Sequence, residues 1–472
     1  MEFISVLPSP QEFIKFSVSL LRSTLFVPRQ QASNRVFLSD FDVDGESGFF
    51  PRHPLPQLPK PFNLWEAALE EAVGGLSLGE DVSEEAIAKR AFGKTWRNNV
   101  MSWPVIETDV LEADLKLLQK AHQVLAWLVH FFVHSIPPQD DAPIVVPKSI
   151  AVPLVAVSRV LGIAPVLTFA DTVLWNWEPI DSNCPVSTEN MRVKYLFSGT
   201  EDERNFYLTS ARAELRGVEM LRIIDAYQNL PNLTDLTSIS RVSRDLTRLA
   251  TIIEDISDII QSVRGLVDPH VFYWDIRVWW EGSDAKGPNG PGWVYEGVAD
   301  GDKLDLSGPS AGQSSVMHAL DIFLGIDHKL QQRRLPAPTP ENKRADRGFM
   351  DRMRRYMPGK HREFLAYLAA SPRPIRDIAQ GTPALREPYD TAVMALKKLR
   401  DLHMRIACLY VVSMSRSLPG ARAGCPVSAM MARLEKSQAS GQGPVRGTGG
   451  NELSLLLKAG RDATRRAALK DN

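Results

Sequence analysis

One histidine of this sequence, His403, lies in surroundings that suit metal chemistry. It belongs to a segment, 386–416, whose apolar residues recur at helical spacing, and Arg400 precedes it by about one turn on nearly the same face. A neutral imidazole can bind iron, and a guanidinium can pair with a carboxylate of a bound group. A histidine on an apolar face is more often a packed core residue, so spacing alone leaves both interpretations open.

Two further segments resemble known motifs but lack the context that those motifs need. The segment DFDVDG at 40–45 begins like a calcium-binding loop, but its twelfth position, which should carry a bidentate carboxylate, is Pro51. The segment GPSAG at 308–312 matches the turn that exposes a nucleophilic serine, but that turn follows a strand of a large sheet. We interpret the first as an acidic turn and the second as a loop that caps a helix beginning near Gln313.

Two histidines, His130 and His134, are four residues apart, which places both rings on one face of a predicted helix. Such a pair can hold a metal, but no acidic or cysteine partner has a helpful spacing, and packing at the edge of a core is the alternative. The GTGG segment at 447–450 is too short for a dinucleotide-binding fingerprint and lacks the preceding strand.

The elements that must position these residues are predicted to be helices. Apolar residues recur at helical spacing, and prolines and glycines separate the periodic segments. The predicted helices span about 63–73, 107–134, 149–162, 205–228, 235–263, 313–326, 343–356, 386–416 and 451–468. Strand signals are scarce, and 272–280 is the best of them. The sequence therefore predicts an all-α, mainly helical fold.

A proline-rich segment divides the predicted helices into two groups. Residues 137–147 cannot continue a helix, so we place a domain boundary there. The predicted organisation is an N-terminal extension at 1–34, a small helical domain at 35–145 and a larger helical domain at 146–472. Within the larger domain, 417–450 is rich in Gly, Ala, Ser and Pro, and we expect a mobile loop there.

The composition is that of an ordinary globular protein. Of the 472 residues, 44% are hydrophobic and 24% are charged, and the formal net charge of -1 indicates neither a nucleic acid nor an anionic membrane as partner. The three cysteines, Cys184, Cys408 and Cys425, are far apart, which argues against a disulfide scaffold and suits a reducing compartment. No apolar segment is long enough for a membrane span, which takes about 20 residues. We expect a cytoplasmic protein, and a monomer.

From about residue 36 to the C-terminus, the sequence resembles the indoleamine 2,3-dioxygenase family. The matching blocks occur in the family's order. They are DFDVDGESGFFP at 40–51, IAVPLVAVSRVLGIAPVLTFADTVLWNW at 150–177, VDPHVFYWDIRVWWEG at 267–282, VYEG at 294–297, SGPSAGQSSVMHALDIFLGI at 307–326, MRRYMPGKHREFL at 353–365, KKLRDLH at 397–403 and GTGG at 447–450. So many ordered matches are far more specific than any single motif, and they include the DFDVDG and GPSAG segments.

The resemblance implies a haem b group in the larger domain. His403 matches the family's proximal iron ligand, Arg400 the basic residue beside it, and Asp321 the ion-pair partner of that residue. Such partners hold a ligand and its helix in place. Ser310 is also implied as a contact of the cofactor. The nearest rival histidine, His361, lies in a block that the resemblance places away from the iron.

The resemblance also implies a pocket for an indole substrate. The substrate-binding positions are Phe169, Thr172, Val173, Phe206, Ser210, Phe272, Tyr273, Arg277, Ser310, Ala311 and Thr448. Aromatic rings pack well against an indole, and a guanidinium can hold a carboxylate through two parallel hydrogen bonds. Ser210 and Arg277 are the positions that we expect to act in catalysis, and Thr448 would close over the amino-acid end of the substrate. Without the resemblance, core packing and a surface ion pair would explain these residues.

The activity implied is cleavage of the indole C2–C3 bond of L-tryptophan by O2 on ferrous haem. The product would be N-formyl-L-kynurenine, with both oxygen atoms from O2, at the first step of the kynurenine pathway towards NAD. The protein supplies orientation and a dry pocket, and the cofactor supplies the oxygen chemistry. An electron donor must reduce ferric haem before it binds O2.

Four pocket positions depart from the better-known vertebrate members of the family. Phe169 replaces a tyrosine, Thr172 a cysteine and Pro309 a glycine, and Tyr273 stands where phenylalanine is common. These changes leave two alternatives open. One is a member that acts on another indole, and the other is a protein of the same fold that binds O2 on haem without turnover. The presence of Arg277 and of the GTGG segment favours an enzyme.

Overall fold

The computed structural model describes residues 37–138, 142–285, 292–328, 348–419, 448 and 453–469. Leu38–Asn472 form one compact unit, which contains all the described helices and strands. The N-terminal extension predicted at 1–34 lies outside the described residues, as do Cys425 and most of the predicted loop at 417–450.

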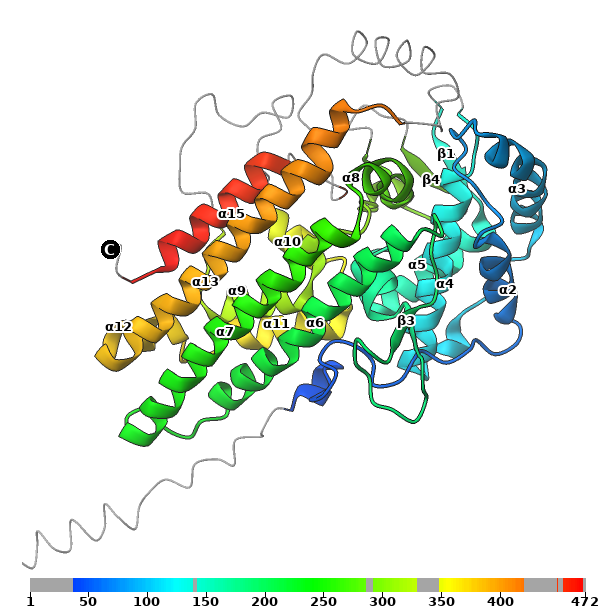
Figure 1. The fold of residues 1–472 in the computed structure, drawn as a ribbon. Helices are drawn as coiled ribbons and strands as arrows, with labels where there is room; N and C mark the ends of the chain where they lie inside the picture. The colour runs from blue at the N-terminus through cyan, green and yellow to red at the C-terminus, as the bar shows by residue number, and fades with distance from the viewer. Residues whose placement is uncertain are drawn as a thin grey trace, which may run out of the picture. The chain divides into compact units, whose positions relative to one another are not determined.

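Helices make up most of the described chain, which confirms the predicted all-α fold (Figure 1). The helices are α2 (Asn63–Ala72), α3 (Glu84–Ser102), α4 (Leu115–His134), α5 (Lys148–Leu161), α6 (Glu201–Gln228), α7 (Leu236–Leu266), α8 (Pro269–Val271), α9 (Ser315–Phe323), α10 (Phe349–Arg354), α11 (Gly359–Ala369), α12 (Ile375–Gly381), α13 (Pro383–Ala407) and α15 (Leu453–Ala467). The strands in this part of the chain are short. They are β1 (Ile144–Val146), parallel to β4 (Trp293–Tyr295), and β2 (Trp177–Pro179), antiparallel to β3 (Met191–Val193).

Local signals set the ends of the helices that carry the candidate site residues. The hydroxyl of Thr200 accepts a hydrogen bond from the backbone N–H of Glu203 and so caps α6, and Ser314 caps α9 in the same way. Pro383 occupies the first turn of α13, where its missing N–H costs nothing. Most predicted helices are therefore confirmed, with ends shifted by a few residues.

The predicted strand at 272–280 is wrong. Phe272–Ile276 form a turn of π-helix, and Arg277–Trp280 continue as a 3₁₀-helix. Asp268 starts this helical run by accepting hydrogen bonds from the backbone N–H groups of His270 and Val271. The run is rich in aromatic and β-branched residues, which favours a strand, but in such a short apolar run the helical and the strand patterns are hard to distinguish.

Four helices of the described chain were not predicted, namely α3, α8, α11 and α12. Few residues of α3 are buried, so its apolar pattern is weak, although Ser83 caps it and two glutamates occupy its first turn. The predicted helix at 107–134 begins later than expected, because Asp114 caps α4 and only a 3₁₀ turn, Asp109–Leu111, precedes it. The last part of the predicted helix at 386–416 is a π-helical segment, Cys408–Ser413, followed by a 3₁₀ turn.

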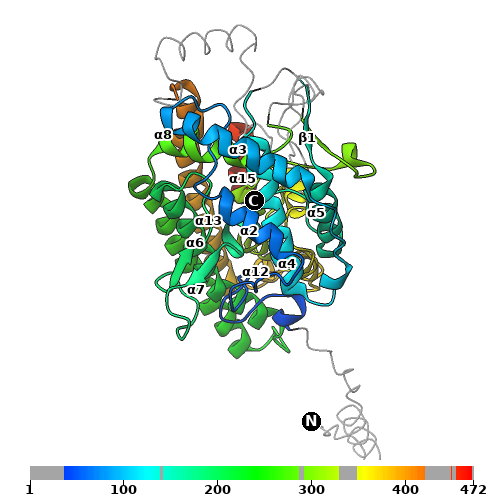
Figure 2. The ribbon, with the colours of Figure 1, turned by 90° about the vertical axis from the view of Figure 1, so that its right-hand side faces the viewer.

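The core of the N-terminal half is built around α4. All its residues from Leu118 to Val133 are buried, and α2 and α5 pack against it (Figure 2). α4 and α5 lie on either side of the predicted domain boundary at 137–147, so the packing of α4 on α5 joins the two predicted domains. The division into two domains stays a prediction. Within the described residues, no helix combines the length and the apolar character needed to cross a membrane.

The C-terminal half contains a row of long helices. Here α6 packs on α7, α7 on α13, and α13 on α15, so these four helices lie side by side (Figure 1). α9 packs against α6 and also against α11. This arrangement brings α13, which carries His403, close to α6, α9 and α15.

Candidate functional site

A cavity of about 360 Å³ lies among α6, α7, α9, α10, α13 and α15. This volume lies within the range of small-molecule sites, about 300–1,000 Å³. Apolar side chains form most of its lining, and polar groups are few. The cavity thus has the composition of a binding site for a flat, largely apolar molecule.

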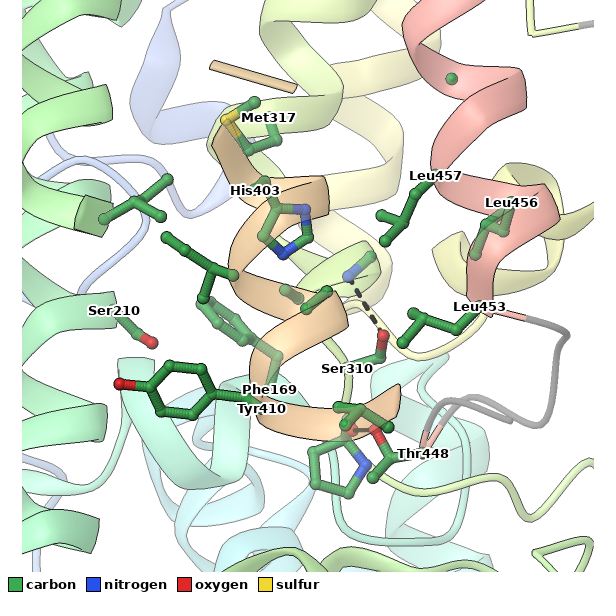
Figure 3. A pocket seen from close by; sticks show the side chains of 18 of the residues that line it. Phe169, Ser210, Ser310, Met317, His403, Tyr410, Thr448, Leu453, Leu456 and Leu457 are labelled. Atoms are coloured by element: carbon green, nitrogen blue, oxygen red, sulfur yellow. Dashed lines mark hydrogen bonds between the residues drawn. The ribbon is translucent and has the colours of Figure 1, made fainter. Parts of the chain in front are cut away.

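His403 projects into this cavity from α13. Figure 3 shows its ring reaching toward the space that Leu453, Leu456 and Leu457 of α15 also face. Within the described residues, neither ring nitrogen takes part in a hydrogen bond or an ion pair. Burial, together with the nearby Arg400, lowers the pKa of His403, which favours the neutral form of the ring. A neutral imidazole without a partner is free to bind a metal ion.

The rival histidine, His361, lies on α11 and does not line the cavity. Its ring packs against Phe49, with ring centroids 4.7 Å apart, and its Nδ1 lies 3.4 Å from the hydroxyl oxygen of Ser315. Burial lowers its pKa to about 4. His361 is therefore a core residue at this position.

A charged cluster forms one corner of the cavity. Nη2 of Arg400 donates to both carboxylate oxygens of Asp321, at 2.5 and 2.6 Å, and Nε2 of His328 lies 2.7 Å from Oδ2 of the same carboxylate. Burial alone would raise the pKa of Asp321, but Arg400 and His328 lower it to about 2. Asp321 is therefore ionised, and it joins α13, which carries His403, to α9.

Three aromatic side chains form an apolar wall. The centroid of the Phe206 ring, on α6, lies 4.9 Å from the ring centroid of Phe272 and 5.2 Å from that of Trp280. Nε1 of Trp280 donates to the hydroxyl of Tyr207 at 2.9 Å, which fixes the indole ring of Trp280 in the wall. Sequence reasoning did not select Trp280, although it lies eight residues after Phe272 and so shares a helical face with it.

Two hydroxyl groups line the cavity near this wall. The hydroxyl of Thr172 donates to the carbonyl oxygen of Thr168 at 3.1 Å, and that of Ser210 donates to the carbonyl oxygen of Phe206 at 3.1 Å. Since the hydrogen atom of each hydroxyl is engaged by the backbone, each oxygen can still accept a hydrogen bond from a bound molecule.

A buried hydrogen-bonded pair of side chains supports the segment that carries Phe169, Thr172 and Val173. This segment is a turn of π-helix, Ala170–Leu174. Oδ1 of Asp171 lies 2.8 Å from Nδ1 of His122, and Oδ2 accepts hydrogen bonds from the backbone and the hydroxyl of Thr168. Both side chains of the pair are fully buried, so the pair fixes the segment to α4 from behind the cavity.

Arg277 brings a positive charge to the cavity wall. It is only 9% exposed, and its Nη1 donates to Oε1 of Glu281 at 2.7 Å. Tyr273 does not line the cavity, in contrast to its predicted place in the pocket; its ring centre lies 5.3 Å from Cζ of Arg277. Phe272 and Tyr273 are consecutive residues of a helical turn, and consecutive side chains of a helix project in different directions, so only Phe272 faces the cavity.

The loop around Ser310 is held by short-range contacts. The hydroxyl of Ser310 accepts a hydrogen bond from the backbone N–H of Gly312 at 3.2 Å (Figure 3), so Ser310 caps the 3₁₀ turn that precedes α9. The hydroxyl of Thr448 donates to the carbonyl oxygen of Pro309 at 2.6 Å. This contact joins Thr448, from the predicted loop at 417–450, to the cavity wall. The GPSAG segment therefore caps a short 3₁₀ turn, whereas the cap of α9 is Ser314, just outside this segment.

The structure thus brings nearly all the predicted site residues together. Those that line the cavity are Phe169, Thr172, Val173, Phe206, Ser210, Phe272, Arg277, Ser310, Ala311, Asp321, Arg400, His403 and Thr448. Sequence reasoning missed His328 in the charged corner and the leucines of α15. The sequence predicted a helix at about 451–468, but it could not show that Leu453, Leu456 and Leu457 face the cavity.

The other segments considered in the sequence have structural roles. Asp44 accepts hydrogen bonds from two backbone N–H groups of its own turn, and Asp42 contacts Lys116 and Gln119 of α4, which confirms the acidic turn. His130 and His134 each lie within 2.8 Å of a backbone carbonyl oxygen of the segment that follows Arg277, namely those of Trp279 and Glu281. The packing interpretation of this histidine pair is confirmed.

Comparison with known proteins agrees with this site. The family model described as indoleamine 2,3-dioxygenase matches residues 37–467. The chain is 30% identical to indoleamine 2,3-dioxygenase 1 of Mus musculus over 438 residues, which cover 92% of this chain and 97% of the relative. It is 30% identical to the indoleamine 2,3-dioxygenase of Saccharomyces cerevisiae over 75% of this chain and 79% of the relative. It is also 28% identical, over 90% of this chain and 96% of the relative, to a protein of Fusarium equiseti named 6-hydroxytryptophan 2,3-dioxygenase. Because these matches cover most of the chain, it belongs to the indoleamine 2,3-dioxygenase family.

Proposed function

We propose that this protein is a haem-dependent dioxygenase that cleaves the indole C2–C3 bond of L-tryptophan with O2 and releases N-formyl-L-kynurenine. The observation that carries this proposal is the ring of His403, neutral and without a partner among the described residues, in the wall of a largely apolar cavity. Membership of the family supports the same reaction.

The residues around His403 fit a haem. Apolar side chains of α7, α13 and α15 suit the faces of a porphyrin, and the charged corner at Arg400 and His328 suits its carboxylates. When bound through His403 in its ferrous state, haem b supplies the activation of O2, for which an electron donor must keep the iron reduced. The pKa of His403 leaves the ring in the form that binds iron.

The other lining residues hold the substrate. The rings of Phe206, Phe272 and Trp280 offer an apolar wall against which an indole can pack, and they exclude water from it. Arg277 presents the positive charge that a tryptophan carboxylate needs. Holding the indole in one place and one orientation is a large part of what a protein contributes to such a reaction.

Turnover of the haem-loaded protein tests this proposal. The wild-type protein and a His403→Ala variant would be reconstituted with haem, reduced, and mixed with L-tryptophan and O2. We expect N-formyl-L-kynurenine from the wild type only, and a change in the haem absorption spectrum of the variant. An unchanged haem spectrum in the variant would show that another residue binds the iron, and a wild type that binds O2 stably without product from any indole would favour an oxygen-binding role.

A second candidate substrate is a ring-hydroxylated tryptophan. The hydroxyl oxygens of Thr172 and Ser210 can both accept a hydrogen bond, whereas an unsubstituted indole ring has a single donor, its N–H. A hydroxyl on the ring would supply a second donor. The relative from Fusarium equiseti, named for 6-hydroxytryptophan, favours the same candidate.

Substrate competition separates the two candidates. The kcat/KM values of wild type and Thr172→Val would be measured with L-tryptophan and with 6-hydroxy-L-tryptophan. If the hydroxylated substrate is the natural one, the valine variant should lose about 2- to 13-fold in kcat/KM with that substrate alone, because the lost hydrogen bond is worth about 0.5–1.5 kcal/mol. A clear preference of the wild type for L-tryptophan would rule this candidate out.

A further inference from the structure

The charged corner of the cavity contains a residue that neither the resemblance nor the sequence pattern selected. His328 follows α9 by five residues, and its ring lines the cavity beside Asp321 and Arg400. The side chains of Asp321 and Arg400 are 4% and 13% exposed, whereas that of His328 is 21% exposed. Of the three, His328 is therefore the most accessible to a molecule in the cavity.

The donors of Arg400 are largely occupied within the protein. Its Nη2 donates to both oxygens of Asp321, and its Nη1 donates to the hydroxyl of Thr464 and, at 3.2 Å, to the carbonyl oxygen of Gly460. Its positive charge is balanced by the carboxylate of Asp321. A further carboxylate that enters this corner would find a neutral ion pair, in which only Nε of Arg400 is without a hydrogen bond to a described residue.

A protonated His328 would supply the hydrogen-bond donor and the net positive charge that the pair of Arg400 and Asp321 lacks. Its Nε2 is engaged by Asp321, and within the described residues its Nδ1 has no hydrogen-bond partner. An imidazolium donates from both nitrogens, so a protonated His328 can hold Asp321 and a second carboxylate at once. With Arg400 and Asp321 cancelling, this protonated ring would give the corner the single positive charge that one carboxylate requires.

We propose that His328 is a cofactor-binding residue that donates a charge-assisted hydrogen bond to a propionate of the haem. The inference rests on the proposed haem-dependent function. In this proposal, Arg400 mainly joins α13 to Asp321 and to α15, and His328 makes the direct contact with the propionate. His403 remains the only iron ligand in this account.

The test compares haem with its dimethyl ester, which lacks the carboxylate charges. Wild type, His328→Ala and His328→Lys would be loaded with either compound, and the dissociation rate would be measured by transfer to an excess of a haem-scavenging protein. We expect haem to leave the alanine variant about tenfold faster than the wild type, because a charge-assisted hydrogen bond is lost. The ester should leave both proteins at the same rate, and the lysine variant should regain much of the haem retention. His53→Ala, which removes an exposed histidine elsewhere, is the matched control.

Each other outcome contradicts the inference. An unchanged rate of haem loss in His328→Ala, or an equal acceleration with haem and with the ester, would overturn it. Loss of the histidine-ligated haem spectrum in His328→Ala would make His328 the iron ligand and overturn it as well. If the wild type retains haem and turns over an indole, and His328→Ala loses haem at the same rate, this inference alone is refuted. If the wild type binds no haem, the proposed function is refuted too.

Discussion

Among single residues, Arg277 is the one whose chemistry can be tested most selectively. Its guanidinium lines the cavity and is nearly buried, so a hydrogen bond to a substrate carboxylate should be worth about 1.5–3 kcal/mol. We expect Arg277→Ala to raise the KM for L-tryptophan by about 10- to 100-fold. Tryptamine, which lacks the carboxylate, should be affected far less. An equal rise in KM with both substrates would mean that Arg277 supports the structure of the cavity wall and does not bind the carboxylate.

The residues of the site differ in how far the sequence could predict them. The resemblance identified His403, Arg400 and Asp321, because each lies in a block with a distinctive order of residues. Tyr273 was predicted in the pocket but does not line the cavity, and the sequence pattern could not show which of the two neighbouring aromatic side chains, Phe272 or Tyr273, faces it. His328 could not be predicted, because its contact with Asp321 depends on how the chain turns back after α9 at Gly325, which the sequence pattern does not show.

Between elements, a buried carboxyl group links α6 to the start of α9. Glu214 is 4% exposed, Ser314 donates to its Oε1, and within the described residues Oε2 has no partner that meets hydrogen-bond geometry, although the backbone N–H of Val316 is near enough to lower the pKa of the group. Burial raises the pKa of Glu214 to about 7, although the hydrogen bond from Ser314 lowers it. An unpartnered oxygen is consistent with a carboxyl group that is protonated at neutral pH or below.

This raised pKa predicts a loss of stability as the pH rises. Above the unfolded value of 4.5, the unfolded chain releases the proton while the folded protein keeps it until about pH 7, so the free energy of unfolding should fall across this window. From pH 5 to pH 8 the fall should be about 2–3 kcal/mol, and Glu214→Gln should remove it. Urea unfolding of both proteins across this range measures the effect. Parallel pH profiles for the two would contradict it.

The buried pair of His122 and Asp171 holds the turn Ala170–Leu174 against α4, and through it three residues of the cavity wall. We expect His122→Leu to lower the free energy of unfolding by about 3–5 kcal/mol, because it leaves a buried carboxylate without its partner. Arg52→Ala, which breaks an exposed ion pair with Glu46, should change stability little. Urea unfolding at pH 7 compares the two. A similar small loss in both variants would show that the buried pair does not support the turn.

Helices with a strong apolar period could be predicted, whereas short and polar elements could not. α4 and α13 present clear apolar faces, and both were located from spacing alone. The segment 272–280 was misassigned because aromatic and β-branched residues favour a strand locally, whereas the cap at Asp268 and packing around Phe272 and Trp280 favour a helix. Tertiary contacts decided the outcome, and the sequence does not display them directly.

For the molecule as a whole, the C-terminal helix α15 is what completes the cavity. Leu453, Leu456 and Leu457 face the same space as His403 (Figure 3). Arg400 joins α13 to α15 through Gly460 and Thr464. No feature of the sequence shows this closure, because it depends on how α15 packs on α13.

Truncation tests the role of α15. We expect a protein that ends before residue 453 to release haem at least about tenfold faster than the full chain, because apolar side chains and the contacts of Arg400 are lost. Deletion of residues 1–36, which lie outside the family match at 37–467, should leave the rate of haem release unchanged. Release at equal rates from the full chain and from the protein without α15 would contradict this role of the helix.

The central claim is the proposed reaction: with haem bound through His403, this protein would insert both atoms of O2 into an indole substrate held in the cavity. Its most direct test is turnover of the reduced, haem-loaded protein with L-tryptophan under ¹⁸O2, followed by mass spectrometry of the product. The account predicts N-formyl-L-kynurenine that carries two ¹⁸O atoms, and no product from His403→Ala. A product with one labelled atom, or the same doubly labelled product from the His403→Ala variant, would contradict it.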